Sequence, residues 1–138
     1  MQPSIVIFGK NGQVGYELNQ RLSSLYKVIA LTSKEADFSK PDAVAKILEQ
    51  LKPDIIINAA AHTAVDKAET ERDLAYLVNS ETPAIIANYC KQHHSLLIHY
   101  STDFVFDGQN DKAYLETDIT NPLGVYGASK LQGEEKIQ

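Results

Sequence analysis

The stretch Ser4–Gly15, SIVIFGKNGQVG, decides the fold. Its first half is a short run of β-branched and aromatic residues, typical of a strand that is buried on both faces of a parallel sheet. Its second half places Gly9, Gly12 and Gly15 directly after that strand and at the start of a helical pattern. Glycine lets the backbone turn tightly and lie close to a pyrophosphate, and the following helix offers free N–H groups and a positive dipole end. The stretch therefore predicts a dinucleotide-phosphate site, the alternative being a glycine-rich turn without a ligand.

The rest of the chain alternates between strand and helix patterns. Three further apolar runs predict strands at 27–31, 54–58 and 96–101. Patterns with one apolar face predict helices at 13–25 (Val14, Leu18, Leu22 and Leu25), 42–51 and 82–94, the last with Thr82 as its N-cap. Residues 104–124 are rich in Asp, Asn, Thr and Gly and predict a long loop. We expect an α/β fold: one Rossmann-type domain over residues 1–138, a doubly wound parallel sheet with helices on both faces.

Composition excludes some classes of protein and partner. The chain has 138 residues, of which 43% are hydrophobic and 22% charged, as in an ordinary globular domain. Its net charge of -5 argues against nucleic acid and anionic membrane as partners. The sequence has neither an apolar run of about 20 residues nor the pattern of a signal peptide. Cys90 is the single cysteine, which rules out an internal disulfide; we expect it to be buried and the protein to be cytoplasmic.

The end of the second predicted strand bears on the choice of cofactor. Folds that prefer NAD often place an acid there, which holds the ribose 2′-hydroxyl. Here Thr32, Ser33 and Lys34 follow the strand, and no acid appears before Glu35. A hydroxyl and an ammonium suit a 2′-phosphate, which favours NADP(H) over NAD(H). The alternative is that Lys34 is an ordinary solvated lysine.

Two further groups of residues point to the chemistry. The strand at 96–101 delivers Ser101, Thr102 and Asp103 at its C-terminal edge, where open α/β sheets bind ligands. Tyr126 and Lys130 are four positions apart, on one face of a predicted helix. A tyrosine pKa near 10 is too high for easy proton donation at neutral pH, and a neighbouring ammonium stabilises a phenolate. A hydroxyl at the end of the strand can also hydrogen-bond a reacting carbonyl.

Five stretches carry a resemblance to a known family: GKNGQVG, DFS, KPDIIINAAAHTAVDKAE, YSTDFVFDG and NPLGVYGASKLQGE. The chain resembles the extended short-chain dehydrogenase/reductase superfamily, and within it the enzymes that reduce the C4 keto group of a dTDP-linked 4-keto-6-deoxy sugar to give dTDP-L-rhamnose for surface polysaccharides. The resemblance implies an oxidoreductase that uses NADP(H), with NAD(H) as a second possibility, and a dTDP-sugar as its substrate.

The resemblance also implies a role for individual residues. Thr102, Tyr126 and Lys130 would form the catalytic triad, and Thr102 and Asp103 would contact the substrate. The residues expected along the cofactor are Gly9, Gly12, Gln13, Val14 and Gly15 at the phosphates, Ser33, Lys34, Asp37 and Phe38 at the adenosine, Ala61, His62 and Thr63 after the third strand, and Tyr100, Tyr126 and Lys130 at the nicotinamide.

Three alternatives stay open. A sugar 4,6-dehydratase would carry Glu where Phe104 follows Asp103, and an epimerase would favour an acid after the second strand. A non-catalytic relative, of the kind that regulates methionine adenosyltransferase, would be expected to have lost the triad. Members of the family are about twice as long, so we expect a substrate lobe beyond residue 138 and little or no turnover by this piece alone. We expect no metal site in the chain, although a magnesium-bridged homodimer of the longer protein could use Glu17.

Overall fold

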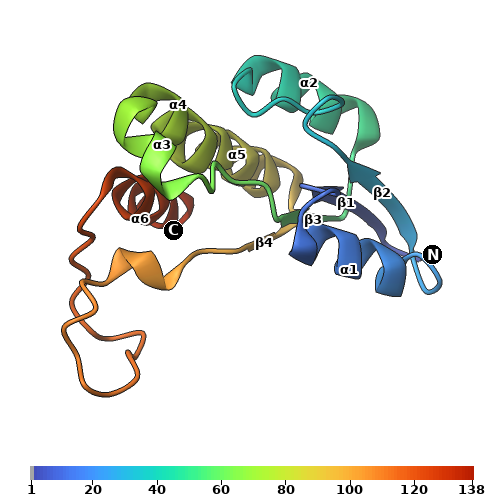
Figure 1. The fold of residues 1–138 in the computed structure, drawn as a ribbon. Helices are drawn as coiled ribbons and strands as arrows, with labels where there is room; N and C mark the ends of the chain where they lie inside the picture. Colours follow the sequence, from blue (N-terminus) through green and yellow to red (C-terminus); the bar gives the residue numbers. More distant parts are fainter. Residues whose placement is uncertain (1) are drawn as a thin grey trace.

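The computed structural model describes residues 2–138, and its centre is a parallel four-stranded sheet (Figure 1). The strands run in the order β2-β1-β3-β4. Their bounds are β1 (Ser4–Phe8), β2 (Lys27–Leu31), β3 (Ile55–Asn58) and β4 (Leu96–His99). This confirms the predicted parallel α/β sheet. Two of the strands are shorter than predicted. Strand β3 begins after Asp54, and β4 ends at His99 rather than at Ser101.

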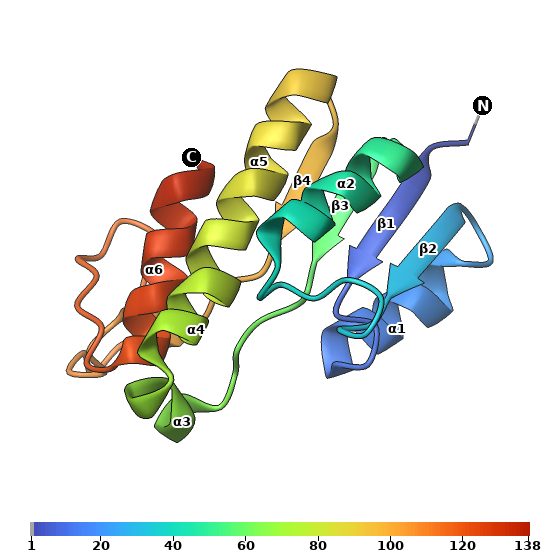
Figure 2. The same cartoon turned by 90° about the horizontal axis from the view of Figure 1, so that it is seen from above.

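Helices cover both faces of the sheet, as predicted for a doubly wound fold. Figure 2 shows α1 on one face, and α2, α5 and α6 side by side on the other. The helices are α1 (Gln13–Leu22), α2 (Pro41–Leu51), α3 (Val65–Thr70), α4 (Arg72–Tyr76), α5 (Thr82–His93) and α6 (Val125–Ile137). Two short turns complete the chain, a π-helical η1 (Leu77–Glu81) and a 3-10 η2 (Asp103–Val105). Within the described residues no helix is long and apolar enough to cross a bilayer.

The alternation of side chains along β1 builds two cores. Ile5 and Ile7 point to the face that α1 covers, where Leu18 and Leu22 pack on them. Val6 and Phe8 point to the opposite face and join the larger core under α2 and α5. These four side chains are at most 3% exposed, so β1 is the buried centre of the fold. The glycine turn therefore starts from a rigid support.

Two helix predictions were wrong in detail. The helix predicted at 13–25 ends at Leu22. Leu25 lies in the turn that follows, where its N–H donates to the Leu22 carbonyl, and its side chain is 61% exposed. Val14, in the exposed first turn of α1, is 43% exposed, so neither residue belongs to the apolar face.

Thr82 does not act as an N-cap. The helical backbone runs into it from η1 without a break, and its Oγ1 donates instead to the Phe38 carbonyl at 2.7 Å. The prediction failed because the segment 65–81, which forms α3, α4 and η1, has no clear apolar period and was not expected to be helical.

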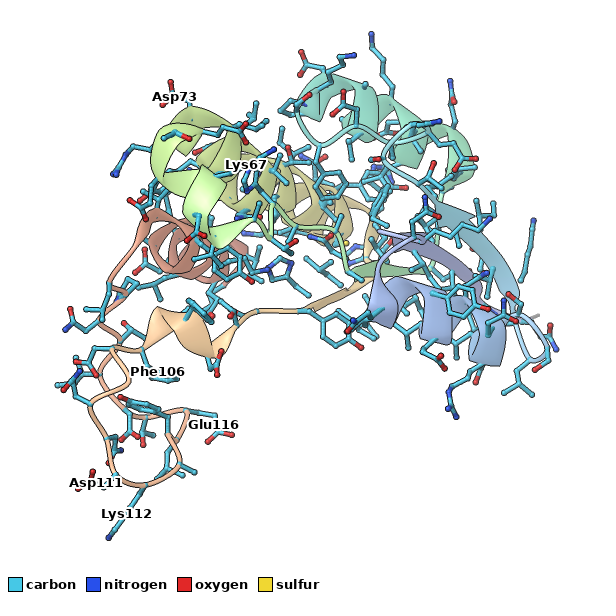
Figure 3. All side chains as sticks on the ribbon, in the orientation of Figure 1. Lys67, Asp73, Phe106, Asp111, Lys112 and Glu116 are labelled. Carbon is cyan, nitrogen blue, oxygen red and sulfur yellow. The ribbon has the colours of Figure 1, made fainter. Side chains whose placement is uncertain are left out.

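The long loop predicted at 104–124 is present and extends away from the sheet (Figure 3). The rings of Phe106 and Tyr114 stack at 4.2 Å between centroids. Asp107 accepts hydrogen bonds from the Tyr114 hydroxyl and the Asn121 amide, at 2.9 and 3.1 Å. The loop is thus held by its own side chains. Cys90 is buried as predicted, and burial raises the pKa of its thiol to about 11.

Candidate functional site

The glycine turn is built as a tight connection between β1 and α1. Gly9 has φ of 87°, and a Cβ there would lie 2.6 Å from the Ala59 carbonyl oxygen. A Cβ on Gly15 would lie 2.1 Å from the Gly9 oxygen, so α1 can start this close to the turn only with glycine at that position. The amides of Gly9 and Lys10 both donate to the Leu31 carbonyl at 3.1 Å, which ties the turn to the end of β2.

A cavity of about 310 Å³ opens beside this turn. Gly12, the N-cap of α1, lines it and offers no side chain to the free N–H groups of the first helical turn. A Cβ on Gly12 would meet only the Gly9 oxygen, at 3.4 Å, and would otherwise occupy open space. Free amides, the dipole of α1 and an open approach fit a pyrophosphate.

The cavity contains about half of the residues that the sequence predicted for the cofactor. Those that line it are Gly9, Gly12, Ser33, Asp37, Phe38, Ala61 and Thr63, together with Asn11, Ala36, Ala59, Ala60 and Val78, which were not predicted. Those that do not line it are Gln13, Val14, Gly15, Lys34, His62, Tyr100, Tyr126 and Lys130. Lys34 is exposed on the surface, and its role at a 2′-phosphate stays a prediction.

Asp37 forms a small polar turn on the wall of the cavity. Its Oδ1 accepts hydrogen bonds from the backbone N–H and the hydroxyl of Ser39, at 2.9 and 2.7 Å. These bonds lower the pKa of the Asp37 carboxyl, and Lys40 lies 3.4 Å from its other oxygen. Asp37 therefore presents an ionised, oriented carboxylate at the wall of the cavity.

His62 is held by two partners from the segment that the sequence did not predict as helical. Its backbone N–H donates to Asn79 Oδ1 at 2.8 Å, and Asn79 Nδ2 donates to the His62 carbonyl at 3.2 Å. The His62 ring contacts Glu71 at 2.9 Å through Nε2, and that contact is the main reason why the pKa of Glu71 is lowered. The loop after β3 therefore has a fixed path. Within the described residues, the Nδ1 atom of the His62 ring is buried and has no hydrogen-bond partner.

Lys130 is the most buried of the predicted catalytic residues. Its side chain is on α6, it is only 3% exposed, and its Nζ donates to the Tyr100 carbonyl at 2.6 Å. Burial lowers the pKa of this ammonium from its ordinary value, and the charge of Glu134 opposes that shift. Lys130 therefore joins α6 to the chain that leaves β4.

Tyr126 and Asp103 line one cavity of about 460 Å³, next to the loop. The ring of Phe104 packs edge-on against that of Tyr126, at 5.4 Å. Thr102 and Asp103 line a neighbouring cavity of about 570 Å³, and Thr102 Oγ1 accepts a hydrogen bond from the Phe104 N–H at 3.2 Å. Asp103 borders both cavities, so the structure brings the predicted substrate residues and the tyrosine to one end of the sheet.

Helix α6 is fixed by residues that sequence reasoning missed. Three consecutive residues of η1 each contact it: Asn79 bonds Ser129 at 3.0 Å, Ser80 bonds Gln132 at 2.7 Å, and Glu81 pairs with Lys136. A Cβ on Gly133 would lie 2.2 Å from the Asn79 carbonyl oxygen, so the two helical segments touch through their backbones. The sequence feature that could have indicated these contacts is the polar pair Asn79 and Ser80, which directly follows the apolar pair Leu77 and Val78.

The N-terminus of α6 is capped from α3. Gly124, its N-cap, has no side chain, and Glu69 Oε1 accepts the hydrogen bond of the Val125 N–H at 2.7 Å. A carboxylate at a helix N-terminus also interacts favourably with the helix dipole. The position of Tyr126 in the first turn of α6 thus depends on Glu69, which is 56 positions before Val125.

A half-buried histidine, His99, lies near the charge of Lys130. Asn58 Oδ1 accepts from the Ala60 N–H at 3.1 Å, so Asn58 Nδ2 faces His99 Nδ1, at 3.0 Å, as a donor. This assignment leaves the ring proton of neutral His99 on Nε2, which is buried without a partner in the described residues. Burial, with a smaller contribution from the charge of Lys130, lowers the pKa of His99 to about 4.

The structure gives no support for a magnesium site at Glu17. Its carboxylate is exposed on α1 and lies 3.6 Å from Arg21, one helical turn away. No group of three His, Cys, Asp or Glu side chains in residues 2–138 is arranged to hold a metal ion.

Comparison with known proteins gives a consistent result. Residues 2–138 match the family described as the RmlD substrate binding domain. The dTDP-4-dehydrorhamnose reductase of Escherichia coli K12 is 49% identical over 139 aligned residues, which cover 98% of this chain and 46% of that protein. A crystal structure of the Clostridium acetobutylicum reductase superposes with a TM-score of 0.92 at 38% identity, covering 97% of this chain and 48% of that one.

A second solved structure bears on the cofactor. The Bacillus anthracis dTDP-4-dehydrorhamnose reductase, in complex with NADP, has a TM-score of 0.93 and 36% identity, covering 99% of this chain and 49% of that one. The chain spans about half the length of the relatives that it matches. On the match over residues 2–138, the chain belongs to the RmlD substrate binding domain family.

Proposed function

We propose that this chain is the dinucleotide-binding and catalytic part of a reductase that converts dTDP-4-dehydro-L-rhamnose to dTDP-L-rhamnose. One observation carries the proposal: buried Lys130 and its neighbour Tyr126 are on one helix that is tied to the end of β4, beside Thr102 and Asp103. The names of the relatives, and the NADP bound to one of them, support both the substrate and the cofactor.

The cofactor supplies a hydride to C4 of the sugar. Tyr126 donates its phenolic proton to the oxygen that becomes the 4-hydroxyl, and Thr102 donates a hydrogen bond to the same oxygen. The Lys130 ammonium stabilises the phenolate that remains on Tyr126, and also offers a hydrogen bond to the cofactor ribose. The carbonyl of Tyr100 holds that ammonium in place at 2.6 Å.

The glycine turn and α1 bind the pyrophosphate through backbone amides, and the wall formed by Ser33, Asp37 and Phe38 receives the adenosine. Ala61 and Thr63 lie along the path between the two ends of the cofactor, and His62 keeps that loop in place. We propose NADP(H) as the cofactor, with NAD(H) also accepted. The roles of Gln13, Val14, Gly15 and Tyr100 in binding the cofactor stay proposals that rest on the family resemblance.

The rival chemistries fit less well. Elimination by a dehydratase needs a carboxylate after Asp103, and Phe104 stands there with its ring against Tyr126. A purely regulatory relative has no need for a buried lysine beside the tyrosine. We place the protein in the cytoplasm, as the reduced Cys90 suggests. A homodimer of the longer protein is proposed from the resemblance alone.

The test joins residues 1–138 to the remaining half of the Escherichia coli relative. We expect this chimera to consume NADPH when it is given the dTDP-linked 4-keto sugar, and Tyr126→Phe to lower the rate at least about a hundredfold. We expect the 138-residue chain alone to bind NADPH and to turn over slowly or not at all. A chimera that binds NADPH but leaves the keto sugar unreduced would contradict the proposal.

A further inference from the structure

The chain that leaves β4 is joined to α6 at two consecutive residues. The Tyr100 carbonyl accepts a hydrogen bond from Lys130 Nζ at 2.6 Å. The hydroxyl of the next residue, Ser101, donates to Glu134 Oε1. Lys130 and Glu134 are four positions apart and so lie on the same face of α6. The two contacts therefore fasten the chain to α6 immediately before Thr102, one of the proposed catalytic residues.

Glu134 brings a negative charge to the neighbourhood of the buried ammonium. Burial lowers the pKa of Lys130, and the charge of Glu134 opposes that shift. The carboxylate itself is only half-buried, and it lines the cavity of about 570 Å³ together with Ser101, Thr102 and Asp103. Glu134 is therefore linked to the lysine by charge and to the chain that carries Thr102 by a hydrogen bond.

Charged groups on the neighbouring elements do not replace this carboxylate. Glu69 of α3 and Glu81 of η1 are each hydrogen-bonded to another residue of α6. His99 of β4 is coupled to the charge of Lys130, but burial lowers the pKa of His99 to about 4, so the ring is uncharged at neutral pH. Glu134 is therefore the acid that supports the charge of Lys130.

We propose that Glu134, held by Ser101, is a positioning residue for the reduction, an inference that rests on the reductase function proposed above. Its carboxylate keeps the Lys130 ammonium charged and keeps Thr102 in a fixed position relative to that ammonium. Glu134 acts through these two residues rather than on the sugar itself. A lysine that stays charged can stabilise the phenolate that remains when Tyr126 gives up its proton.

The first test compares Glu134→Gln with Glu135→Gln, a matched control that removes the same charge from the next, exposed position of α6. Gln at 134 keeps an oxygen for the Ser101 hydroxyl. Carbon NMR of the Lys130 Cε atom, assigned by its loss in Lys130→Met, follows the ionisation of the lysine in the 138-residue chain. In Glu134→Gln the midpoint of this titration should move to lower pH by roughly half a unit, the scale of one partly exposed charge pair. In Glu135→Gln the midpoint should stay where it is.

The second test uses the chimera with the remaining half of the Escherichia coli relative. In Glu134→Gln the alkaline limb of kcat against pH should move in the same direction, because the ammonium loses its proton more easily, while the KM for NADPH stays unchanged. Ser101→Ala leaves the carboxylate charged but without its donor, and should lower kcat roughly two- to tenfold. Ser101→Thr restores a hydroxyl and should recover kcat.

The two tests separate this inference from the proposed function. Equal Lys130 midpoints in Glu134→Gln and Glu135→Gln, or an alkaline limb that does not move in Glu134→Gln, would overturn the inference and leave the reductase function standing. A wild-type chimera that binds NADPH but leaves the keto sugar unreduced would contradict the proposed function, and the catalytic role of Glu134 with it.

Discussion

Asn79 and Ser129, fifty positions apart in the chain, are joined by a buried hydrogen bond of 3.0 Å from Nδ2 to Oγ. The same Asn79 amide exchanges two hydrogen bonds with the backbone of His62. One side chain therefore connects the loop after β3 with the helix that carries Tyr126 and Lys130. Because Asn79 is only 1% exposed, water cannot replace these bonds.

We expect Asn79→Ala to lower the free energy of unfolding by about 2–3 kcal/mol, since it leaves buried donors and acceptors without partners. Urea unfolding measures this loss. Asn88→Ala, at an exposed position on α5, is the matched control and should change stability by less than about 0.5 kcal/mol. Equal losses in the two variants would mean that the network around Asn79 contributes no special stability.

Gly12 and Gly15 should respond differently to alanine. At Gly15 the new Cβ would lie 2.1 Å from the Gly9 oxygen, so Gly15→Ala should be strongly destabilising. At Gly12 the Cβ would have room, so Gly12→Ala should fold with nearly the wild-type melting temperature but bind dinucleotide at least about tenfold more weakly, because the methyl group enters the cavity. Thermal melts and NADPH titrations on both variants separate the two effects; unchanged binding by Gly12→Ala would refute the phosphate role.

Lys130 should make stability rise with pH in the alkaline range. Burial lowers the pKa of Lys130 below its ordinary 10.5, so between the folded and unfolded pKa values the unfolded chain binds more protons. The free energy of unfolding of the wild type, relative to Lys130→Met, should therefore increase as pH rises towards 10.5 and fall as pH drops. Urea unfolding of both proteins at several pH values measures the difference between their free energies of unfolding. A difference that does not change with pH would contradict a lowered pKa of Lys130.

His99 should make the protein sensitive to acid. Burial lowers the pKa of His99 from 6.5 to about 4, so its contribution to stability is present above 6.5 and is lost as pH falls towards 4. His99→Gln, which cannot be protonated, should show a shallower loss of stability over the same interval. NMR titration of the His99 ring protons gives a direct check, with the exposed His94 as an internal reference.

The carboxylate cap on α6 gives a further test. Glu69→Ala removes the acceptor of the Val125 N–H and should cost about 1 kcal/mol of stability. Glu135→Ala, at an exposed position on α6 itself, removes the same charge without touching the cap. If the two variants unfold at the same urea concentration, the hydrogen bond to Val125 contributes little.

The parts of the fold that sequence reasoning found are those with local signals. The strands are short runs of β-branched residues, and Gly15 must be glycine because a Cβ there would lie 2.1 Å from the carbonyl oxygen of nearby Gly9. Tyr126 and Lys130 follow from their helical spacing. These patterns are visible because the physical cause lies within a few residues of the pattern.

The supporting residues were missed because their partners are distant in the chain. Asn79 acts on Ser129, and Glu69 acts on Val125 across 56 positions, so neither has a local pattern. The π-helical turn η1, which contains Asn79, likewise packs against Gly133 of α6, a contact between distant parts of the chain.

The order of the residues along the chain has a consequence for biosynthesis. Every residue that lines the dinucleotide cavity lies between Gly9 and Val78, whereas Thr102, Tyr126 and Lys130 all come later. A ribosome releases the N-terminal segments first, so a nascent chain gains the proposed phosphate-binding turn before Tyr126, its proposed proton donor. The residues of η1 must then wait for some fifty further residues before α6 can dock on them. A dinucleotide that bound the proposed site at that stage would stabilise the unfinished chain against proteolysis, and so would act as a folding ligand before α6 has docked.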